Sequence, residues 1–272
     1  MSLSISMVGF DNKANLSPKE ILAQMQSKRF ADLGNAVETP AGKPTETSMV
    51  CFKAAGFDII YAMMPAAIPN IEGALAQSWL FPDASEHFKR CTQHCIVTVL
   101  KENSTALERA PIITQATSAL IAASGDTALG VYWGDAEMSI NPKIFLEMTE
   151  KVLPGYRLGE YPIYLWVNLL IEPGQNGGSS GLTRGMAAFG HMEFEAKDTP
   201  EPIDELRERF RSLANYVLVN GPVIKDGDTI GENKTERIQV VYSQSMYGNP
   251  ERVMRLNYQQ PAAKKPWWKK FG

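Results

Sequence analysis

The sequence predicts an α+β protein made of two tandem ferredoxin-like units, each with a βαββαβ order of elements and an antiparallel sheet. The first observation is that strand, helix, strand, strand, helix and strand signals follow one another between Ile5 and Leu100. The second is that the same order returns between Ala128 and about Tyr242. The third is a mostly apolar helical stretch, Thr105–Ser124, which lies between the two runs and predicts a connecting helix.

These signals divide the chain into four parts. We expect a first α+β unit over residues 1–103, a connecting helix over 104–126, a second α+β unit over 127–258, and a disordered basic and aromatic tail over 259–272. With 272 residues, 44% of them hydrophobic and 21% charged, the chain has an ordinary globular composition and can form two modest domains.

The first unit contains a helix with clear starting signals and a strand that is almost wholly apolar. Ser17 can cap a helix, Pro18 suits its first position, and Glu20 can close a capping box. The run Cys95–Leu100 (CIVTVL) is typical of a central strand that is covered on both faces. The other expected elements are strands Ile5–Phe10, Thr47–Lys53 and Phe57–Met64 and a helix over about Ile71–Arg90, either continuous or broken near Pro82.

In the second unit the strongest strand signal is Pro162–Ile171 (PIYLWVNLLI). The Gly- and Ser-rich residues 173–185 predict a mobile hairpin loop. Thr199 and Pro200 begin a helix whose apolar stripe is Ile203, Leu206, Phe210, Leu213 and Val217. The other expected elements are strands Ala128–Trp133, Met192–Ala196, Arg237–Tyr242 and Arg252–Tyr258 and a helix that starts at Asn141–Pro142.

Charge and cysteine content indicate where such a protein works. A net charge of −3 argues against a general nucleic-acid binder, which would carry a basic excess. No stretch approaches the about 20 apolar residues that span a bilayer, and the amino terminus lacks a basic secretory signal. The odd count of three cysteines, Cys51, Cys91 and Cys95, favours a reduced, cytoplasmic compartment.

One cluster of potential metal ligands stands out. His87, Cys91, His94 and Cys95 would partly share a face on an unbroken helix, and their nitrogen and sulfur donors suit zinc. However, the strand that starts near Cys95 breaks the helical register, and the spacing matches no common zinc module. The favoured interpretation is that the cysteines are small buried thiols and that a histidine is hydrogen-bonded where a helix joins a strand. We therefore expect no metal and no cofactor.

No complete catalytic motif is present. The chain has only three histidines for acid–base chemistry. Glu193 and Glu195 would share one face of a strand and could divide acid and base roles, although such a pair is more often the solvent-facing side of a sheet. The Gly-rich residues 177–185 offer backbone donors and Arg184, but neither phosphate-binding glycine motif is present. The expected set of catalytic residues is empty.

The candidate binding residues are His94, Trp133, Arg184, Glu193, Trp267 and Trp268. Trp133 ends an apolar strand, where it either fills the core or lines a pocket, with the core favoured. The two tail tryptophans alternate with lysines in KKPWWKKF, a pattern that can contact an anionic membrane surface or a protein partner. A disordered terminus is the alternative.

Several segments occur in an order that resembles a known family. They are His94–Val99, Gly130–Gly134, Ser180–Thr183 leading to Phe189, Gly190 and Glu193, and Asp226–Gly231, and together they cover most of residues 50–245. In these segments the chain is similar to the bacterial domain-of-unknown-function family 4261 (DUF4261). The resemblance implies a bacterial, intracellular α/β protein and supplies no catalytic residues. It also implies that some members are accessory or immunity proteins encoded beside secreted toxins.

The leading functional hypothesis is a non-enzymatic binding protein of the bacterial cytoplasm. Specifically, we expect an immunity protein that neutralises a secreted (type VI or contact-dependent) toxin by direct protein–protein binding. The alternative is a hydrolase-type enzyme whose site lies between the two α+β units and is lined by His94, Trp133, Arg184 and Glu193. A third hypothesis is a metal-dependent regulator that uses the cluster from His87 to Cys95.

Overall fold

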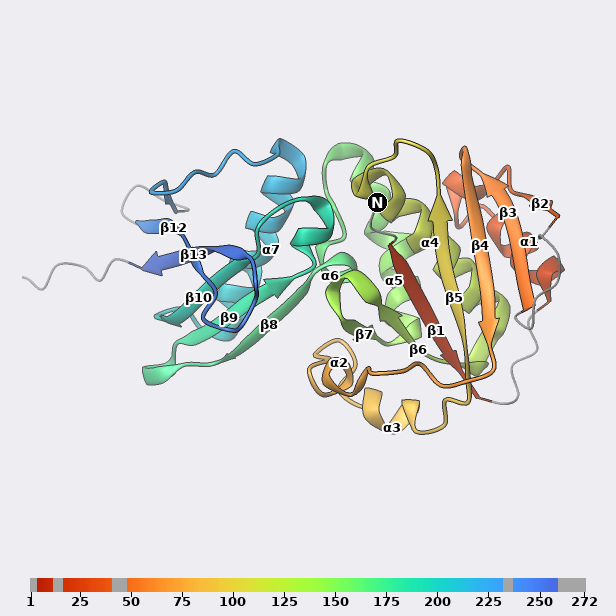
Figure 1. Ribbon diagram of the computed structural model, residues 1–272, viewed down its shortest axis with the longest axis horizontal. Helices are drawn as coiled ribbons and strands as arrows, with labels where there is room; N and C mark the ends of the chain where they lie inside the picture. Colours follow the sequence, from red (N-terminus) through yellow and green to blue (C-terminus); the bar gives the residue numbers. More distant parts are fainter. Residues whose placement is uncertain (1–3, 12–16, 41–47, 232–236, 259–272) are drawn as a thin grey trace, which may run out of the picture. The chain divides into compact units, whose positions relative to one another are not determined.

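The computed structural model describes residues 4–11, 17–40, 48–231 and 237–258, which form an α+β protein with two sheets (Figure 1). The chain divides into two compact units. Unit 1 comprises residues 1–168 and 184–190, and unit 2 comprises residues 169–183 and 191–272. The predicted α+β class is therefore confirmed, whereas the expected start of a second unit at residue 127 falls within unit 1.

Unit 1 is built on a seven-stranded sheet in the order β2-β3-β4-β5-β1-β6-β7. All neighbouring strands in this sheet are antiparallel. Its strands are β1 (Ile5–Phe10), β2 (Val37–Thr39), β3 (Ser48–Ala54), β4 (Phe57–Met64), β5 (Gln93–Leu100), β6 (Ala128–Trp133) and β7 (Met138–Ile140). The apolar run predicted as a central strand is β5, and it does lie inside the sheet, between β4 and β1.

The long helix α4 (Ala106–Ser124) packs on one face of this sheet. It starts with a capping box in which Thr105 accepts from the Glu108 amide at 3.2 Å, and Gly125 follows its last turn. The hydroxyl of Tyr61, on β4, donates to the Ala116 carbonyl at 2.9 Å and ties the sheet to the helix. Every residue from Arg109 to Ile121 is buried. Among the described residues, no helix is long and apolar enough to span a membrane.

The other helices of unit 1 are shorter. They are α1 (Pro18–Met25), α2 (Glu72–Ala76), α3 (Ala84–Phe88), α5 (Pro142–Lys151) and α6 (Ile163–Trp166). Phe88, the last residue of α3, packs directly on the backbone of β1 and β6 at Gly9 and Gly130. A Cβ atom at Gly130 would lie 2.2 Å from the Phe88 ring, so this close approach requires glycine.

Unit 2 has a six-stranded sheet in the order β11-β12-β13-β10-β9-β8. Its strands are β8 (Asn168–Pro173), β9 (Ser179–Arg184), β10 (Phe194–Thr199), β11 (Thr229–Ile230), β12 (Ile238–Gln244) and β13 (Arg252–Tyr258). The central pair, β10 and β13, is parallel, and the other neighbours that pair in this sheet are antiparallel. The first residue of β8 belongs to unit 1 and the remainder to unit 2.

Helix α7 (Ile203–Asn220) covers one face of the unit 2 sheet. Its buried side is Leu206, Phe210, Ala214, Val217 and Leu218, close to the predicted stripe. Phe194 and Ala196 of β10 pair with Met254 and Leu256 of β13, so these four apolar side chains share the face toward α7. Glu195 points to the opposite face, which α7 leaves open.

The arrangement of strands corrects the prediction of tandem ferredoxin-like units. Strand β6, expected to open a second unit, pairs with β1 in the unit 1 sheet, with Val131 opposite Val8. Strand β5 separates β1 from β4, whereas the first and third strands of a ferredoxin-like unit are neighbours. The expected connecting helix, α4, is a core helix instead, because a helix that is apolar on all sides is stable only when it is surrounded.

Three local predictions also need correction. The helix expected over 71–90 is two short helices, α2 and α3, and the alternative of a break near Pro82 is the one observed, because proline lacks the amide that a continuous helix needs. The first half of the strand expected over 162–171 is helix α6, since a short apolar run does not distinguish a buried helix from a strand. Helix α1 begins at Pro18 as predicted, but Ser17 makes no side-chain capping bond.

Candidate functional site

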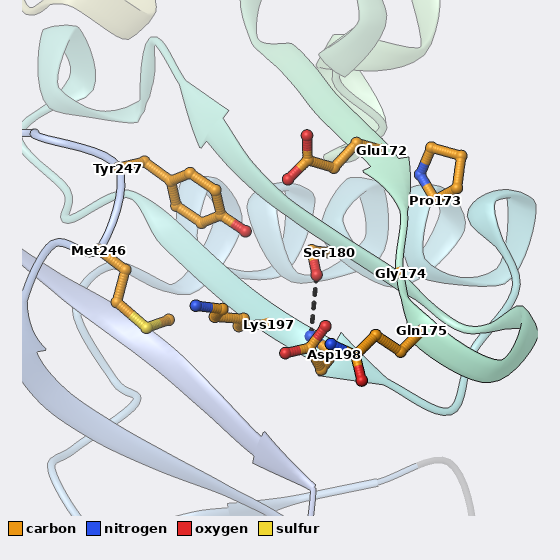
Figure 2. A pocket seen from close by; sticks show the side chains of 9 residues that line it. All are labelled: Glu172, Pro173, Gly174, Gln175, Ser180, Lys197, Asp198, Met246 and Tyr247. Atoms are coloured by element: carbon orange, nitrogen blue, oxygen red, sulfur yellow. Dashed lines mark hydrogen bonds between the residues drawn. The ribbon is translucent and has the colours of Figure 1, made fainter.

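Unit 2 contains a pocket of about 350 Å³ (Figure 2). Three segments that are distant in the sequence surround it: the β8–β9 hairpin, the end of β10, and the loop between β12 and β13. The lining residues are Glu172, Pro173, Gly174, Gln175, Ser180, Lys197, Asp198, Met246 and Tyr247. The pocket lies on the face that α7 leaves open, and most of its lining residues are exposed.

A β-bulge places two of the charged side chains. Between the pairs Ala196–Gly181 and Thr199–Ser179, Lys197 and Asp198 of β10 face the single residue Ser180 of β9. Asp198 adopts a left-handed backbone conformation, with φ of 48°. Its amide, displaced from the ladder, donates to the Ser180 Oγ at 2.9 Å. The bulge therefore directs Lys197 and Asp198 differently from a regular strand, which is a common use of bulges at functional sites.

The β8–β9 turn brings the second wall against this bulge. The Gly174 amide donates to the Gly178 carbonyl at 2.8 Å and closes the turn. A Cβ atom at Gly178 would lie 1.8 Å from the Thr199 carbonyl oxygen, so a larger residue cannot occupy this position without moving the backbone. Glu172 precedes this turn and Gln175 lies within it, and both line the pocket.

A buried carboxylate holds the third wall. Glu195 is 0% exposed, and it accepts a short hydrogen bond from Ser245 and one of 3.0 Å from the Met246 amide. Ser245 in turn accepts from the amides of Tyr247 and Asn249 at 3.0 and 3.1 Å. These bonds fix the loop that presents Met246 and Tyr247 to the pocket.

The charged side chains of the pocket are not used by the fold. Within the described part of the chain, Glu172, Lys197 and Asp198 form no ion pair and no side-chain hydrogen bond. Elsewhere in unit 2 the buried Glu201 pairs with Arg209 of α7 at 2.5 Å. The pocket thus combines a backbone held by internal hydrogen bonds with charges of both signs that are available to a ligand.

The electrostatics of Tyr247 favour binding over proton abstraction. Burial raises the pKa of its phenol, and a hydrogen bond from Ser180 partly opposes this. The carboxylates of Glu172, Glu195 and Asp198 raise the pKa further. Tyr247 therefore keeps its proton at neutral pH and donates a hydrogen bond to the Ala196 carbonyl at 3.4 Å. No histidine lines the pocket, so Ser180 lacks the histidine base that commonly activates a serine nucleophile.

The structure places two of the predicted site residues, His94 and Trp133, in the interior of unit 1. His94 is 5% exposed, and its Nδ1 lies 2.7 Å from the Ala66 carbonyl oxygen. Trp133 is 1% exposed and packs against the Phe145 ring at a centroid distance of 6.2 Å. Both side chains serve packing, so neither is presented to a ligand.

Arg184 and Glu193 have separate partners as well. Arg184 forms an ion pair of 2.7 Å with Glu137 in unit 1. Glu193, in unit 2, is 4% exposed and accepts from the Thr183 hydroxyl at 2.7 Å. The interpretation of Glu193 and Glu195 as a solvent-facing pair was wrong, because both carboxylates are buried. Trp267 and Trp268 lie outside the described residues.

The four potential metal ligands do not converge. His94 and Cys95 are consecutive on β5 and point to opposite faces of the sheet. Cys91 donates to the Gln93 carbonyl, and the His87 ring lies 5.0 Å from the Phe81 ring. Burial raises the pKa of the Cys95 thiol to about 12. Within the described residues, no group of three or more His, Cys, Asp or Glu side chains is placed to hold a metal ion.

None of the nine pocket residues was among the predicted site residues. Two signals for them were present: the Gly- and Ser-rich stretch at 173–185 and the turn that begins at Tyr247. The stretch is not simply a mobile loop, because β9 occupies 179–184. Its small residues serve packing, since a Cβ atom at Gly181 would lie 2.5 Å from the Leu170 carbonyl oxygen.

Comparison with known proteins confirms the family resemblance over part of the chain. Residues 182–257 match the model of the family described as a domain of unknown function, DUF4261. This segment includes Lys197, Asp198, Met246 and Tyr247 of the pocket, whereas His94 and the Gly130–Gly134 segment lie outside it. No curated protein and no solved structure matches the chain.

Proposed function

We propose that the protein is a non-enzymatic binding protein of the bacterial cytoplasm. More specifically, it acts as an immunity protein that neutralises a secreted toxin by direct contact, and the unit 2 pocket is part of its recognition surface. The negative net charge supports this proposal, because complementary charge steers association and lends specificity. The match to DUF4261 places most of unit 2, including one side of the pocket, within the family-like segment.

The observation that carries the proposal is that the charged side chains of the pocket have no partner among the described residues. Glu172, Lys197 and Asp198 stand on backbone that is fixed by the bulge, the Gly178 turn and neighbouring hydrogen bonds, yet their side chains have no partner in the described part of the chain. A preorganised site loses little entropy on binding, which is the main cost of association. Charged side chains that have no partner and stand on a fixed backbone are suited to recognition.

The protonation of Tyr247 removes one candidate base from this pocket. A hydrolytic site needs a base that can take a proton near neutral pH. The raised pKa of Tyr247 removes the phenolate from that role, and the other lining groups include no imidazole. Donors and acceptors of hydrogen bonds remain, and these suffice for recognition.

The test is affinity capture from the native strain with the full chain as bait, followed by mass spectrometry. We expect one partner in stoichiometric amount with the wild-type chain. Glu172→Gln and Asp198→Asn should each reduce its recovery about two- to fivefold, the size expected of one solvent-exposed charge pair. Glu205→Gln serves as the matched control, because Glu205 is an exposed carboxylate on α7 with no partner among the described residues.

Two outcomes would count against the proposal. The first is that no stoichiometric partner is recovered. The second is that the pocket variants and the Glu205→Gln control retain the partner equally well, which would leave the pocket outside the recognition surface. If a partner is captured, addition of the wild-type chain should suppress its toxicity in a growth assay, and the pocket variants should protect less.

A further inference from the structure

We infer that the unit 2 pocket binds a basic amino acid residue with a free carboxylate, either a free amino acid or the last residue of another chain. The inference rests on the proposed function for the biological role of the pocket. Its chemistry rests on the side chains alone: two carboxylates, one ammonium group, one phenolic hydroxyl and one thioether around a small volume. Different classes of ligand would leave different groups of this pocket unsatisfied.

Ligands with a single type of charge fit this pocket poorly. A purely cationic group would pair with Glu172 and Asp198 but would be repelled by Lys197. A purely anionic group would pair with Lys197 but would face both carboxylates. A ligand that carries a carboxylate and a cation a few bonds apart satisfies both sets, because like-charge contacts disfavour the alternatives.

The directions of the side chains assign the two ends of such a ligand. In Figure 2 the hydroxyl of Tyr247 points into the pocket from the β12–β13 loop, and the side chain of Lys197 extends from β10 toward that same loop. The Lys197 ammonium group supplies the positive charge of a carboxylate subsite, beside the Tyr247 hydroxyl, which donates to the Ala196 carbonyl at 3.4 Å. Glu172 and Gln175 belong to the β8–β9 hairpin, and Asp198 of β10 lies beside Gln175. These acceptors form the subsite for the cation.

The remaining features favour arginine among the basic residues. A planar guanidinium can donate to more than one acceptor at once, as two carboxylates and an amide require. Met246, 39% exposed, offers a flexible apolar surface for the methylene chain. The volume of about 350 Å³ lies near the lower limit for ligand pockets, so it suits one residue rather than a longer peptide.

The experiment titrates the full chain with four probes by isothermal titration calorimetry. L-arginine has both cations and the carboxylate, and N-acetyl-L-arginine imitates the end of a chain. L-arginine amide lacks the carboxylate, and L-citrulline lacks the side-chain cation. We expect L-arginine or N-acetyl-L-arginine to bind with a dissociation constant on the order of 1 mM, as for a small ligand in an open site, and the other two to bind more weakly.

Variants connect each end of the ligand to its subsite. Lys197→Ala should weaken binding of N-acetyl-L-arginine about three- to fivefold without weakening L-arginine amide, because only the former has a carboxylate. Glu172→Gln should weaken both of these probes. Glu205→Gln should change neither. If N-acetyl-L-arginine and L-arginine bind with equal affinity, the pocket accepts the end of a chain. If only L-arginine binds, the ligand is a free amino acid.

Three results would overturn the inference: no binding of any probe, equal binding of L-arginine and its amide, or equal binding of L-arginine and L-citrulline. These results are distinct from failure of the proposed function. If the probes fail but capture of a protein partner still depends on Glu172, only the ligand assignment is wrong. If the probes bind as expected and no protein partner is captured, the ligand assignment stands and the proposed function is wrong.

Discussion

At the scale of single residues, Glu195 shows how the fold builds the pocket. A buried carboxylate is costly unless it is hydrogen-bonded, and Glu195 is 0% exposed. Its oxygens accept from Ser245 and from the Met246 amide, so the loop that carries Tyr247 satisfies the carboxylate and is held by it. Ser245 is the connecting group, because it also accepts from two amides of the same loop.

Replacement of Ser245 tests this role. Ser245→Ala leaves one oxygen of Glu195 and two amides with fewer partners, so we expect the free energy of unfolding to fall by about 1–3 kcal/mol. Urea denaturation followed by circular dichroism measures this change. Ser212→Ala is the control, because Ser212 is exposed on α7, and its change should stay within about 0.5 kcal/mol. Equal effects of the two variants would contradict the role given to Ser245.

Some individual residues were accessible to prediction and others were not. The predicted cap at Asn141 depends only on an amide two positions away, and its side chain makes the expected bond. The burial of Glu193 and Glu195 depends on Thr183 and Ser245, which reach them only through strand pairing and loop packing. The alternation of side chains along the strand therefore predicted that Glu193 and Glu195 share one face of the sheet. It did not reveal that other parts of the chain bury both carboxylates.

At the scale of elements, the β8–β9 hairpin depends on glycine for a steric reason. The Gly178 position lies against the Thr199 carbonyl, and this contact sets the hairpin turn beside the bulge of β10. Gly and Ser in this stretch therefore permit close packing of strands. From composition alone the same residues indicate flexibility, which explains why the sequence predicted a loop at 179–184, where the structure has β9.

Substitution of this glycine gives a prediction for the element. In Gly178→Ala the new Cβ would lie 1.8 Å from a backbone oxygen, so the turn must shift, and we expect a loss of about 2–4 kcal/mol in the free energy of unfolding. Thermal denaturation measures it. Gly73→Ala, in helix α2, is the matched control, since no atom lies within 4 Å of its added Cβ. That variant should be neutral or stabilised by up to about 1 kcal/mol. A neutral Gly178→Ala would refute the packing argument.

At the scale of the whole molecule, the two units have separate cores. Unit 1 buries α4 and Trp133, and unit 2 buries Phe210 of α7 against Phe194 and its neighbours in the sheet. Chains with more than one core commonly depart from a single cooperative transition. We therefore expect calorimetry to resolve two unfolding transitions.

A core variant assigns the transitions. Phe210→Ala removes a ring that is 0% exposed, which costs about 3–5 kcal/mol, and it should lower only the transition of unit 2. The control Val219→Ala, on the same helix at 48% exposure, should change that transition by less than about 0.5 kcal/mol. A single transition that moves as a whole with Phe210→Ala would show that the units unfold together.

The sequence by itself determined what depends on near neighbours. It determined the α+β class, the limits of β1, β4 and β13, the apolar stripe of α7 and the start of α4, because alternation, helical period and caps act over a few residues. Only the tertiary structure decided which strands pair, that α4 lies inside a core, and that Glu172, Lys197 and Tyr247 meet in one pocket. These outcomes depend on which distant surfaces are buried together, and the order of residues along the chain does not encode that locally.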